Sequence, residues 1–208
     1  MVRLALVKFT DSIELIDGTM ANCYVVKIQD KIILIDAGMK SSAKKIIDHF
    51  ERTNTPPDLV LITHCHLDHI GGLSDLDSKF HPQIFVPDKE LEIARGNEKM
   101  PSTGGFMSAM VGLTRAKPVN GARPMSELNQ EGLRIVDTNG HTPGSTSFLF
   151  EEYKAIFVGD SVSENKGRYE FSKSFTLDPR NAEVSLRKIL DMHGMTAYPG
   201  HGPVFVVP

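Results

Sequence analysis

The chain has 208 residues, of which 40% are hydrophobic and 24% are charged, and its formal net charge at pH 7 is -3. This composition excludes disordered, collagen-like and low-complexity classes, and the charge gives no broad positive surface for nucleic acid or an anionic membrane. We therefore expect a single domain over residues 1–208, with neither nucleic acid nor membrane as a partner.

Short apolar runs bounded by turn residues predict most of the strands. In chain order, the expected strands span residues 4–9, 24–28, 32–35, 59–63, 84–86, 133–137, 147–150, 155–158, 196–198 and 204–207. A first helix is expected from Ser41 or Ser42, as its N-cap, to about Arg52. A second helix follows Asp178 and Pro179, which suit the N-cap and the first helical position. The alternation of both patterns indicates a layered α/β fold.

Residues 96–125 mix Pro, Gly, Ser and Thr with four methionines around a short helical pattern. We interpret this segment as a lid or a substrate wall. The alternative is a surface insertion whose methionines fill irregular gaps. Loops on a rigid scaffold commonly determine specificity, so we expect residues 96–125 and 161–176 to shape a substrate pocket.

The N-terminal segment and the cysteines bear on localisation. The apolar run between Arg3 and Lys8 is too short for a secretory signal, and no stretch has the length of a transmembrane helix. Cys23 and Cys65 are the two cysteines, which excludes a disulfide framework and leaves a single bridge open. We therefore expect a cytoplasmic protein with reduced thiols.

Three of the 8 histidines, His64, His66 and His69, fall within one six-residue window that also contains Asp68. Side chains repeat with period two along a strand, so His64 and His66 point the same way at a strand end. Asp68 and His69 follow in a turn that can present them beside this pair. Such a cluster predicts a metal centre, because imidazole and carboxylate groups bind zinc, iron or manganese.

Three further candidate ligands lie downstream at His141, Asp160 and His201, each at an expected strand end and beside glycine. Glycine permits the tight turns and close approaches that such positions require. The alternative is that these residues cap or fill the core, as single histidines and turn aspartates often do. Seven candidate groups are too many for one tetrahedral ion, so we expect two metal ions per chain.

These motifs resemble those of the metallo-β-lactamase superfamily, and most closely its glyoxalase II-like hydrolase branch. The resemblance rests on residues 22–26, 34–38, 63–72, 140–145, 158–160 and 198–202, in the family's order. It implies an αββα sandwich with the metals at one edge. It also implies that Asp160 bridges two sites, one held by His64, His66 and His141 and the other by Asp68, His69 and His201.

The same resemblance gives Asp36 a structural role in organising the loops near the metals. True β-lactamases commonly have a cysteine where this chain has Asp160, so we do not expect drug hydrolysis. Strand alternation turns the Cys65 thiol away from the neighbouring ligands, and we expect a small buried residue there. The remaining histidines match no motif and are expected to be structural or surface residues, namely His49, His81 and His193.

The function implied is a binuclear metal-dependent hydrolase with a small-molecule substrate. Two divalent ions, zinc in first place with iron or manganese as alternatives, would hold a bridging hydroxide that attacks a small thioester, lactone or related ester. Asp68 would also be catalytic, as the base that steers the proton of the nucleophile. The sequence predicts no oligomeric state.

The same motifs are also compatible with four other functions. Acyl-homoserine lactonases resemble this pattern, but their active-site tyrosine corresponds to Ser163, so Tyr169 or Tyr198 would have to replace it. The formal net charge of -3 argues against a nucleic-acid phosphodiesterase. The presence of all seven candidate ligands argues against a non-catalytic metal-binding module. Persulfide dioxygenases share the fold and resemble mononuclear iron enzymes with a set of the type His64, His66 and Asp160.

Overall fold

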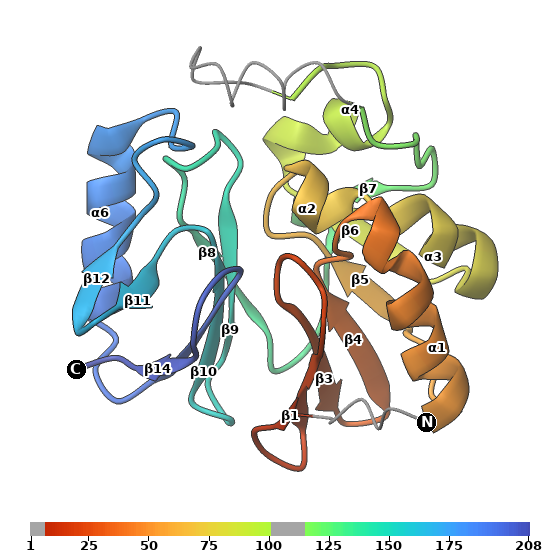
Figure 1. The fold of residues 1–208 in the computed structure, drawn as a ribbon, viewed down its shortest axis with the longest axis horizontal. Coiled ribbons are helices and arrows are strands. Elements are labelled where there is room, and N and C mark those ends of the chain that lie inside the picture. The colour runs from red at the N-terminus through yellow and green to blue at the C-terminus, as the bar shows by residue number, and fades with distance from the viewer. Residues whose placement is uncertain (1–6, 101–114) are drawn as a thin grey trace.

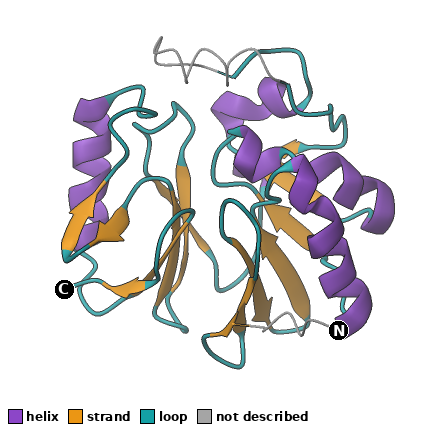
Figure 2. Cartoon of the chain, viewed as in Figure 1, coloured by secondary structure: helices purple, strands orange, loops and turns teal. Residues whose placement is uncertain are grey.

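Two β-sheets stack face to face through the middle of the molecule, and helices cover the outer face of each sheet (Figure 1). The structure is a computed structural model, and it describes residues 7–100 and 115–208. Coloured by element type, the same view shows two layers of strands between two layers of helices (Figure 2). The αββα sandwich implied by the sequence motifs is therefore confirmed.

The strands fall into two mixed sheets and one separate hairpin. In spatial order, the first sheet contains β1 (Val7–Lys8), β2 (Ile13–Ile16), β3 (Cys23–Ile28), β4 (Lys31–Ile35), β5 (Leu59–Leu61), β6 (Gln83–Val86) and β7 (Arg123–Pro124). The second contains β14 (Phe205–Val206), β13 (Thr196–Pro199), β10 (Ala155–Gly159), β9 (Thr146–Phe150) and β8 (Arg134–Asp137). Strands β4 to β7 pair in parallel, as do β10 and β13, and the hairpin joins β11 (Ser163–Asn165) to β12 (Arg168–Glu170).

Helices α1 (Ala43–Thr53) and α3 (Leu73–Phe80) cover the first sheet, and α6 (Pro179–Leu190) covers the second (Figure 1). The other helical elements are short: η1 (Lys40–Ser42), α2 (Leu67–Ile70), η2 (Asp88–Glu90), α4 (Leu91–Ala94) and η3 (Met125–Glu127). Helix α6 begins as predicted, because the Asp178 side chain accepts hydrogen bonds from the backbone N–H groups of Arg180 and Asn181. Ser42 is the N-cap residue of α1, as predicted, but η1 leads directly into the helix and the Ser42 side chain makes no cap hydrogen bond.

Buried apolar side chains form three layers that hold the sandwich together. The layer between the two sheets is rich in aromatic residues, including Tyr24, Phe148, Phe150, Phe157 and Tyr198. The other two layers lie between the first sheet and its helices and between the second sheet and α6. Because each sheet is covered on both faces, the strands are rigid supports for the loops at their ends.

Several elements differ from the sequence pattern. Strand β2 is not predicted because Glu14 interrupts its apolar run, yet Glu14 is buried and lies 3.2 Å from the Nζ atom of Lys27. Strand β7, the hairpin of β11 and β12, and α3 are likewise additional elements. In the predicted insertion, Met100 and Met125 are buried in the core, as the gap-filling alternative expects, whereas residues 101–114 lie outside the described residues.

Neither a disulfide bond nor a membrane-spanning helix is present among the described residues. Cys23 and Cys65 are both free and buried, so the single bridge that the sequence leaves open does not form. Within residues 7–100 and 115–208, no helix combines the length and the apolar character needed to cross a membrane.

Candidate metal centre

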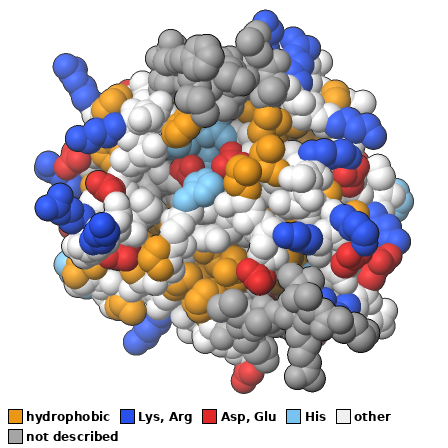
Figure 3. Space-filling model, in the orientation of Figure 1, with side chains coloured by type: hydrophobic (Ala, Val, Ile, Leu, Met, Phe, Trp, Pro, Cys, Tyr) orange, Lys and Arg blue, Asp and Glu red, His pale blue; other side chains and the backbone are white. Residues whose placement is uncertain are grey.

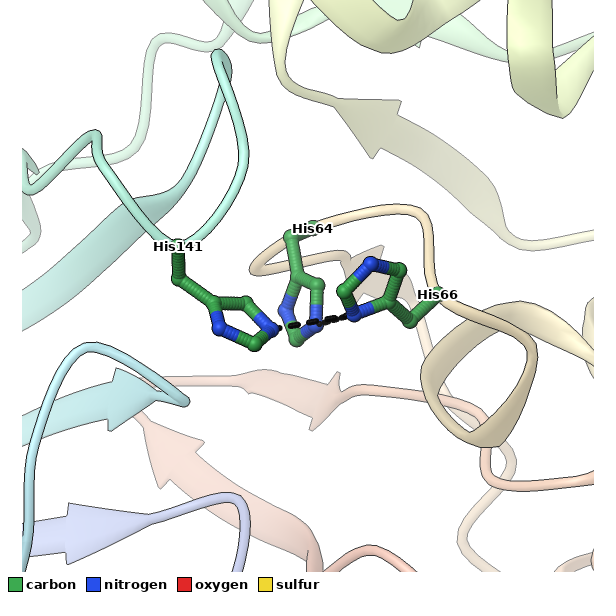
Figure 4. Close-up of side chains that lie close together, drawn as sticks. All are labelled: His64, His66 and His141. Atoms are coloured by element: carbon green, nitrogen blue, oxygen red, sulfur yellow. Dashed lines mark hydrogen bonds between the residues drawn. The ribbon is translucent and has the colours of Figure 1, made fainter. Parts of the chain in front are cut away.

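Three buried histidines converge from two loops. His64 and His66 follow strand β5, and His141 lies in the loop between β8 and β9. The Nδ1 atom of His66 lies 3.0 Å from Nε2 of His64 and 3.0 Å from Nε2 of His141. Figure 4 shows the three rings pointing at one another across the gap between the loops. This three-histidine half of the centre presents one ring nitrogen from each residue to a common point, as a metal site requires.

A second group lies beside the first and contains a carboxylate. The Nε2 atom of His201, which follows β13, lies 2.9 Å from Oδ2 of Asp68, and Nε2 of His69 lies 3.9 Å from the same oxygen. The side chain of His69 is fully buried, whereas those of Asp68 and His201 are 25% and 43% exposed. This carboxylate half is therefore more exposed to solvent than the three-histidine half, whose side chains are buried.

Asp160, at the end of β10, lies between the two halves. Its Oδ2 atom is 3.5 Å from Nε2 of His141 and 3.6 Å from Nε2 of His201, and its Oδ1 atom is 3.4 Å from Nε2 of His69. One carboxylate thus reaches ligands of both halves. The structure brings all seven predicted ligands together at one edge of the sandwich.

The donor set fits metal ions. Nε2 of His69 and Oδ1 of Asp160 are buried and have no hydrogen-bond partner, which is costly unless another group satisfies them. The backbone also leaves room here, because a Cβ atom on Gly200 would lie 2.5 Å from Oδ1 of Asp160 and 2.7 Å from Cε1 of His69. Glycine is therefore required at position 200, and the orphaned atoms are suited to coordinate a cation.

Asp36 orients His69 from outside the centre, in line with its predicted structural role. Its Oδ2 atom lies 2.7 Å from Nδ1 of His69, so this nitrogen carries the proton and Nε2 faces the centre. The same carboxylate accepts hydrogen bonds from the backbone N–H and the hydroxyl of Thr63, both at 2.8 Å. Because the Thr63 hydroxyl donates to Asp36, it accepts from Nδ1 of His64 at 3.1 Å, which leaves Nε2 of His64 free to bind.

Glu90 is a buried carboxylate that the sequence motifs do not reveal. It accepts hydrogen bonds from the backbone N–H groups of Cys65 at 2.6 Å and Gly144 at 2.8 Å, and from the hydroxyl of Thr142. Burial raises the pKa of Glu90, and these hydrogen bonds act against that rise. Glu90 thus joins the loop of His64 and His66 to the loop of His141. No spacing rule points to it, since it ends the short helix η2 among other charged residues.

The three-histidine half favours neutral imidazoles. Burial, followed by the neighbouring imidazoles, lowers the pKa of His64 well below its ordinary value. The same two causes lower the pKa of His66 to about 3. Burial also lowers the pKa of His141, although Asp160 acts against it. These rings are unprotonated at neutral pH and ready to bind a cation.

The carboxylate half has the opposite balance. Burial disfavours a charge on His69, but the carboxylates of Asp36 and Asp160 outweigh it and raise its pKa well above the ordinary value. The hydrogen bond to Asp68 raises the pKa of His201. Burial acts to raise the pKa of Asp68, but the hydrogen bond from His201 and the charge of His69 lower it to about 2. The carboxylates of this half therefore favour the protonated form of His69 and His201.

A cavity of about 500 Å³ opens beside the carboxylate half and is lined by His66, Asp68, Asp160 and His201. A hollow in the molecular surface shows these residue types, with histidine and acidic side chains at its base and hydrophobic side chains beside them (Figure 3). Residues 161–176 contribute to its wall as predicted, through Val162, Ser163, Ser172 and Phe175. The described parts of 96–125 contribute none of the lining residues.

Tyrosine is absent from the lining, and all four tyrosines are among the described residues. Tyr198 is buried between the sheets, with its ring 4.7 Å from that of Phe157. Tyr169 packs instead against Phe205, at 5.1 Å between ring centroids. The suggested replacement of a lactonase tyrosine by Tyr169 or Tyr198 is therefore wrong.

The other residues with sequence expectations lie outside the centre. The Cys65 thiol points toward the backbone oxygen of Glu90 and away from the ligands, as strand alternation predicts. His49 is buried beside Glu14, His81 ends α3 in a left-handed conformation, and His193 contacts the backbone oxygen of Pro208. The structural or surface role expected for these three histidines agrees with their positions.

Comparisons with known proteins cover nearly the whole chain. A family model described as the metallo-beta-lactamase superfamily matches residues 16–201. A probable metallo-hydrolase of Methanocaldococcus jannaschii is 28% identical over 194 residues, which is 90% of each chain. A protein solved in a di-iron-bound form is 26% identical, with a TM-score of 0.73 and 90% of both chains covered. An atrochrysone carboxyl ACP thioesterase of Aspergillus fumigatus is 30% identical over 192 residues, which is 88% of this chain and 51% of that protein.

Proposed function

The chain belongs to the metallo-β-lactamase superfamily of metal-dependent hydrolases, and we propose that it is a binuclear hydrolase of small thioesters or related esters. The observation that carries this proposal is the position of Asp160, whose two carboxylate oxygens reach ligands of both halves of the centre. A single ion held by the three histidines would leave Asp68, His69 and His201 without a metal to bind. We propose zinc as the first candidate metal, with iron or manganese as alternatives.

The candidate ligands divide into two sets, one for each metal ion. We assign His64, His66 and His141 to one ion and Asp68, His69 and His201 to the other, with Asp160 shared between them. Bound divalent ions lower the pKa of water and stabilise developing negative charge on the reacting oxygens. Asp68 lines the cavity and is ionised at neutral pH. Its low pKa makes it a weak base, so we assign it the orientation of the attacking water's proton.

Two observations favour thioesters over the other esters. A relative named as an ACP thioesterase is similar over most of this chain, and another relative is named as a thioesterase. The cavity also lacks the tyrosine that a lactonase of the acyl-homoserine type would use. We therefore place thioesters first and lactones second.

The test is hydrolysis by protein loaded in turn with zinc, iron and manganese, against thioester, lactone and phosphodiester substrates. The proposal predicts thioester turnover that a chelator abolishes and metal restores. Asp160→Asn should lose this activity, whereas Asp30→Asn, at an exposed turn, should keep it. Metal binding without turnover of any ester would overturn the proposal, and oxidation of a persulfide by protein with one iron would replace it.

A further inference from the structure

The wall of the cavity away from the ligands is apolar. Five apolar side chains from separate segments of the chain face the same space, namely Met20, Met39, Leu67, Val162 and Phe175. Met20 and Phe175 are large apolar side chains that are nonetheless 66% and 38% exposed. Exposed apolar groups gathered at a cavity commonly mark a binding surface.

Lysine and arginine are absent from this lining within residues 7–100 and 115–208. The charged groups that line the cavity are all candidate metal ligands, and the remaining polar groups are Ser163 and Ser172. The Ser163 hydroxyl already donates to the backbone oxygen of Glu170 at 3.3 Å. A carboxylate or phosphate held against this wall, away from the candidate ligands, would therefore meet no lysine or arginine.

The position of Phe175 is coupled to the metal centre. Its neighbour Thr176 lies with Oγ1 3.4 Å from Nδ1 of His141, and the N–H of Leu177 donates to the backbone oxygen of His141 at 3.1 Å. The loop that carries the phenyl ring is thus paired with the loop that carries a ligand. The apolar wall is held at a defined place relative to the reacting centre.

We propose that this cavity binds the acyl group of the substrate and selects an uncharged, aliphatic one. This inference rests on the thioesterase activity proposed above. Transfer of an alkyl chain from water to a position against these five side chains is favourable by about 0.8 kcal/mol for each buried methylene. A terminal carboxylate held against the apolar wall would lose its hydration without gaining a lysine or arginine partner. Hydrolysis adds water across the C–S bond, so the acyl carbon gains a C–O bond and the sulfur leaves as a thiol, with no oxidant required.

The experiment uses metal-loaded protein and thioesters of one neutral thiol, N-acetylcysteamine. The acyl groups are acetyl, butanoyl, hexanoyl and adipoyl, the last having the hexanoyl length and a terminal carboxylate. We expect kcat/KM to rise about fourfold for each methylene from acetyl to hexanoyl. Hexanoyl should exceed adipoyl by about tenfold or more, because the carboxylate is desolvated without a partner.

Variants test whether the wall determines this preference. Phe175→Lys should raise adipoyl turnover relative to hexanoyl by about tenfold, since it supplies the missing cation. Met20→Lys, at a more exposed side chain, repeats the test in case the first variant folds poorly. Lys173→Ala is the matched control, because Lys173 is an exposed cation in the same loop that does not line the cavity, and it should leave the ratio unchanged.

The outcomes separate the two proposals. Turnover of all four thioesters without a preference for hexanoyl, or a preference that Lys173→Ala alone alters, would overturn the aliphatic acyl site and leave the thioesterase intact. Absence of turnover with every thioester would overturn the proposed function and this inference with it. A rise with chain length together with rejection of adipoyl would support both.

Discussion

The two halves of the metal centre share Asp160 but differ in burial and in charge. His64, His66 and His141 are buried, and their pKa values are lowered. In the carboxylate half, the pKa values of His69 and His201 are raised by carboxylates. We therefore expect the three-histidine half to bind a cation without losing protons and the carboxylate half to release protons when it binds one.

Each half also has its own buried carboxylate outside the ligand set. Asp36 contacts His69 directly, and Glu90 joins the backbone segments that carry the three histidines. Asp36 therefore acts directly on the carboxylate half and, through Thr63, indirectly on His64, whereas Glu90 acts on the three-histidine half. Their replacement should separate effects on one metal from effects on the other.

The largest effect is expected at the residue that the halves share. Asp160→Ala should lower kcat/KM on the order of 1,000-fold or more, because both halves lose an oxygen ligand and a stabilising charge. Elemental mass spectrometry of the purified variant should show fewer than two metals per chain. Asp30→Ala provides a control at an exposed turn. Unchanged metal content and activity in Asp160→Ala would show that the halves are not joined.

Asp36→Asn should weaken metal binding in the carboxylate half by about 10-fold to 100-fold. The amide no longer supplies the negative charge that orients His69 and increases its basicity. Competition with a chromophoric chelator measures this affinity, and Asp75→Asn serves as a control at a carboxylate paired with Lys40 on the surface. Equal weakening of both metals would mean that the link through Thr63 to His64 dominates.

The pH dependence of metal affinity should differ between the halves. Because the raised pKa values of His69 and His201 keep protons on these rings, affinity in the carboxylate half should fall as pH decreases, by about tenfold per pH unit for each proton displaced. The three-histidine half should change little between pH 6 and 8, since the pKa of His66 is about 3. Chelator competition across this range gives both slopes. Equal slopes would contradict the contrast.

Glu90→Gln should have the smallest effect of the set. The amide can still accept one of the hydrogen bonds but loses the charge, and we expect a loss of about 1–2 kcal/mol in the free energy of unfolding. Urea denaturation of the metal-free protein measures it. Metal affinity should fall in the three-histidine half alone, and Glu90→Ala should cost more on both measures. A loss confined to the carboxylate half would contradict the assignment of Glu90.

The side chains that converge at this edge can be picked out from the sequence because their signals are local. His64, His66 and Asp68 lie in one short window, and glycine marks the strand ends at His141 and His201. The neighbours that orient them depend on contacts across the fold. Glu90 receives hydrogen bonds from residues 25 and 54 positions away, a separation that no periodicity or spacing reveals.

The same distinction applies to the secondary structure. Strands with continuous apolar runs, such as β9 and β10, match their predicted ranges closely. Strand β2 escapes prediction because its Glu14 is buried against Lys27 and His49, which are far away in sequence. The cavity wall is likewise built from several segments, so its apolar character emerges only once the chain is folded.

The most direct test of the contrast between the halves is a calorimetric titration of metal-free protein with zinc at pH 7, in two buffers of different ionisation enthalpy. We expect two zinc ions per chain, one bound with little proton release and one bound with release of protons from His69 and His201. A single ion per chain, or two ions with the same proton release, would contradict this expectation.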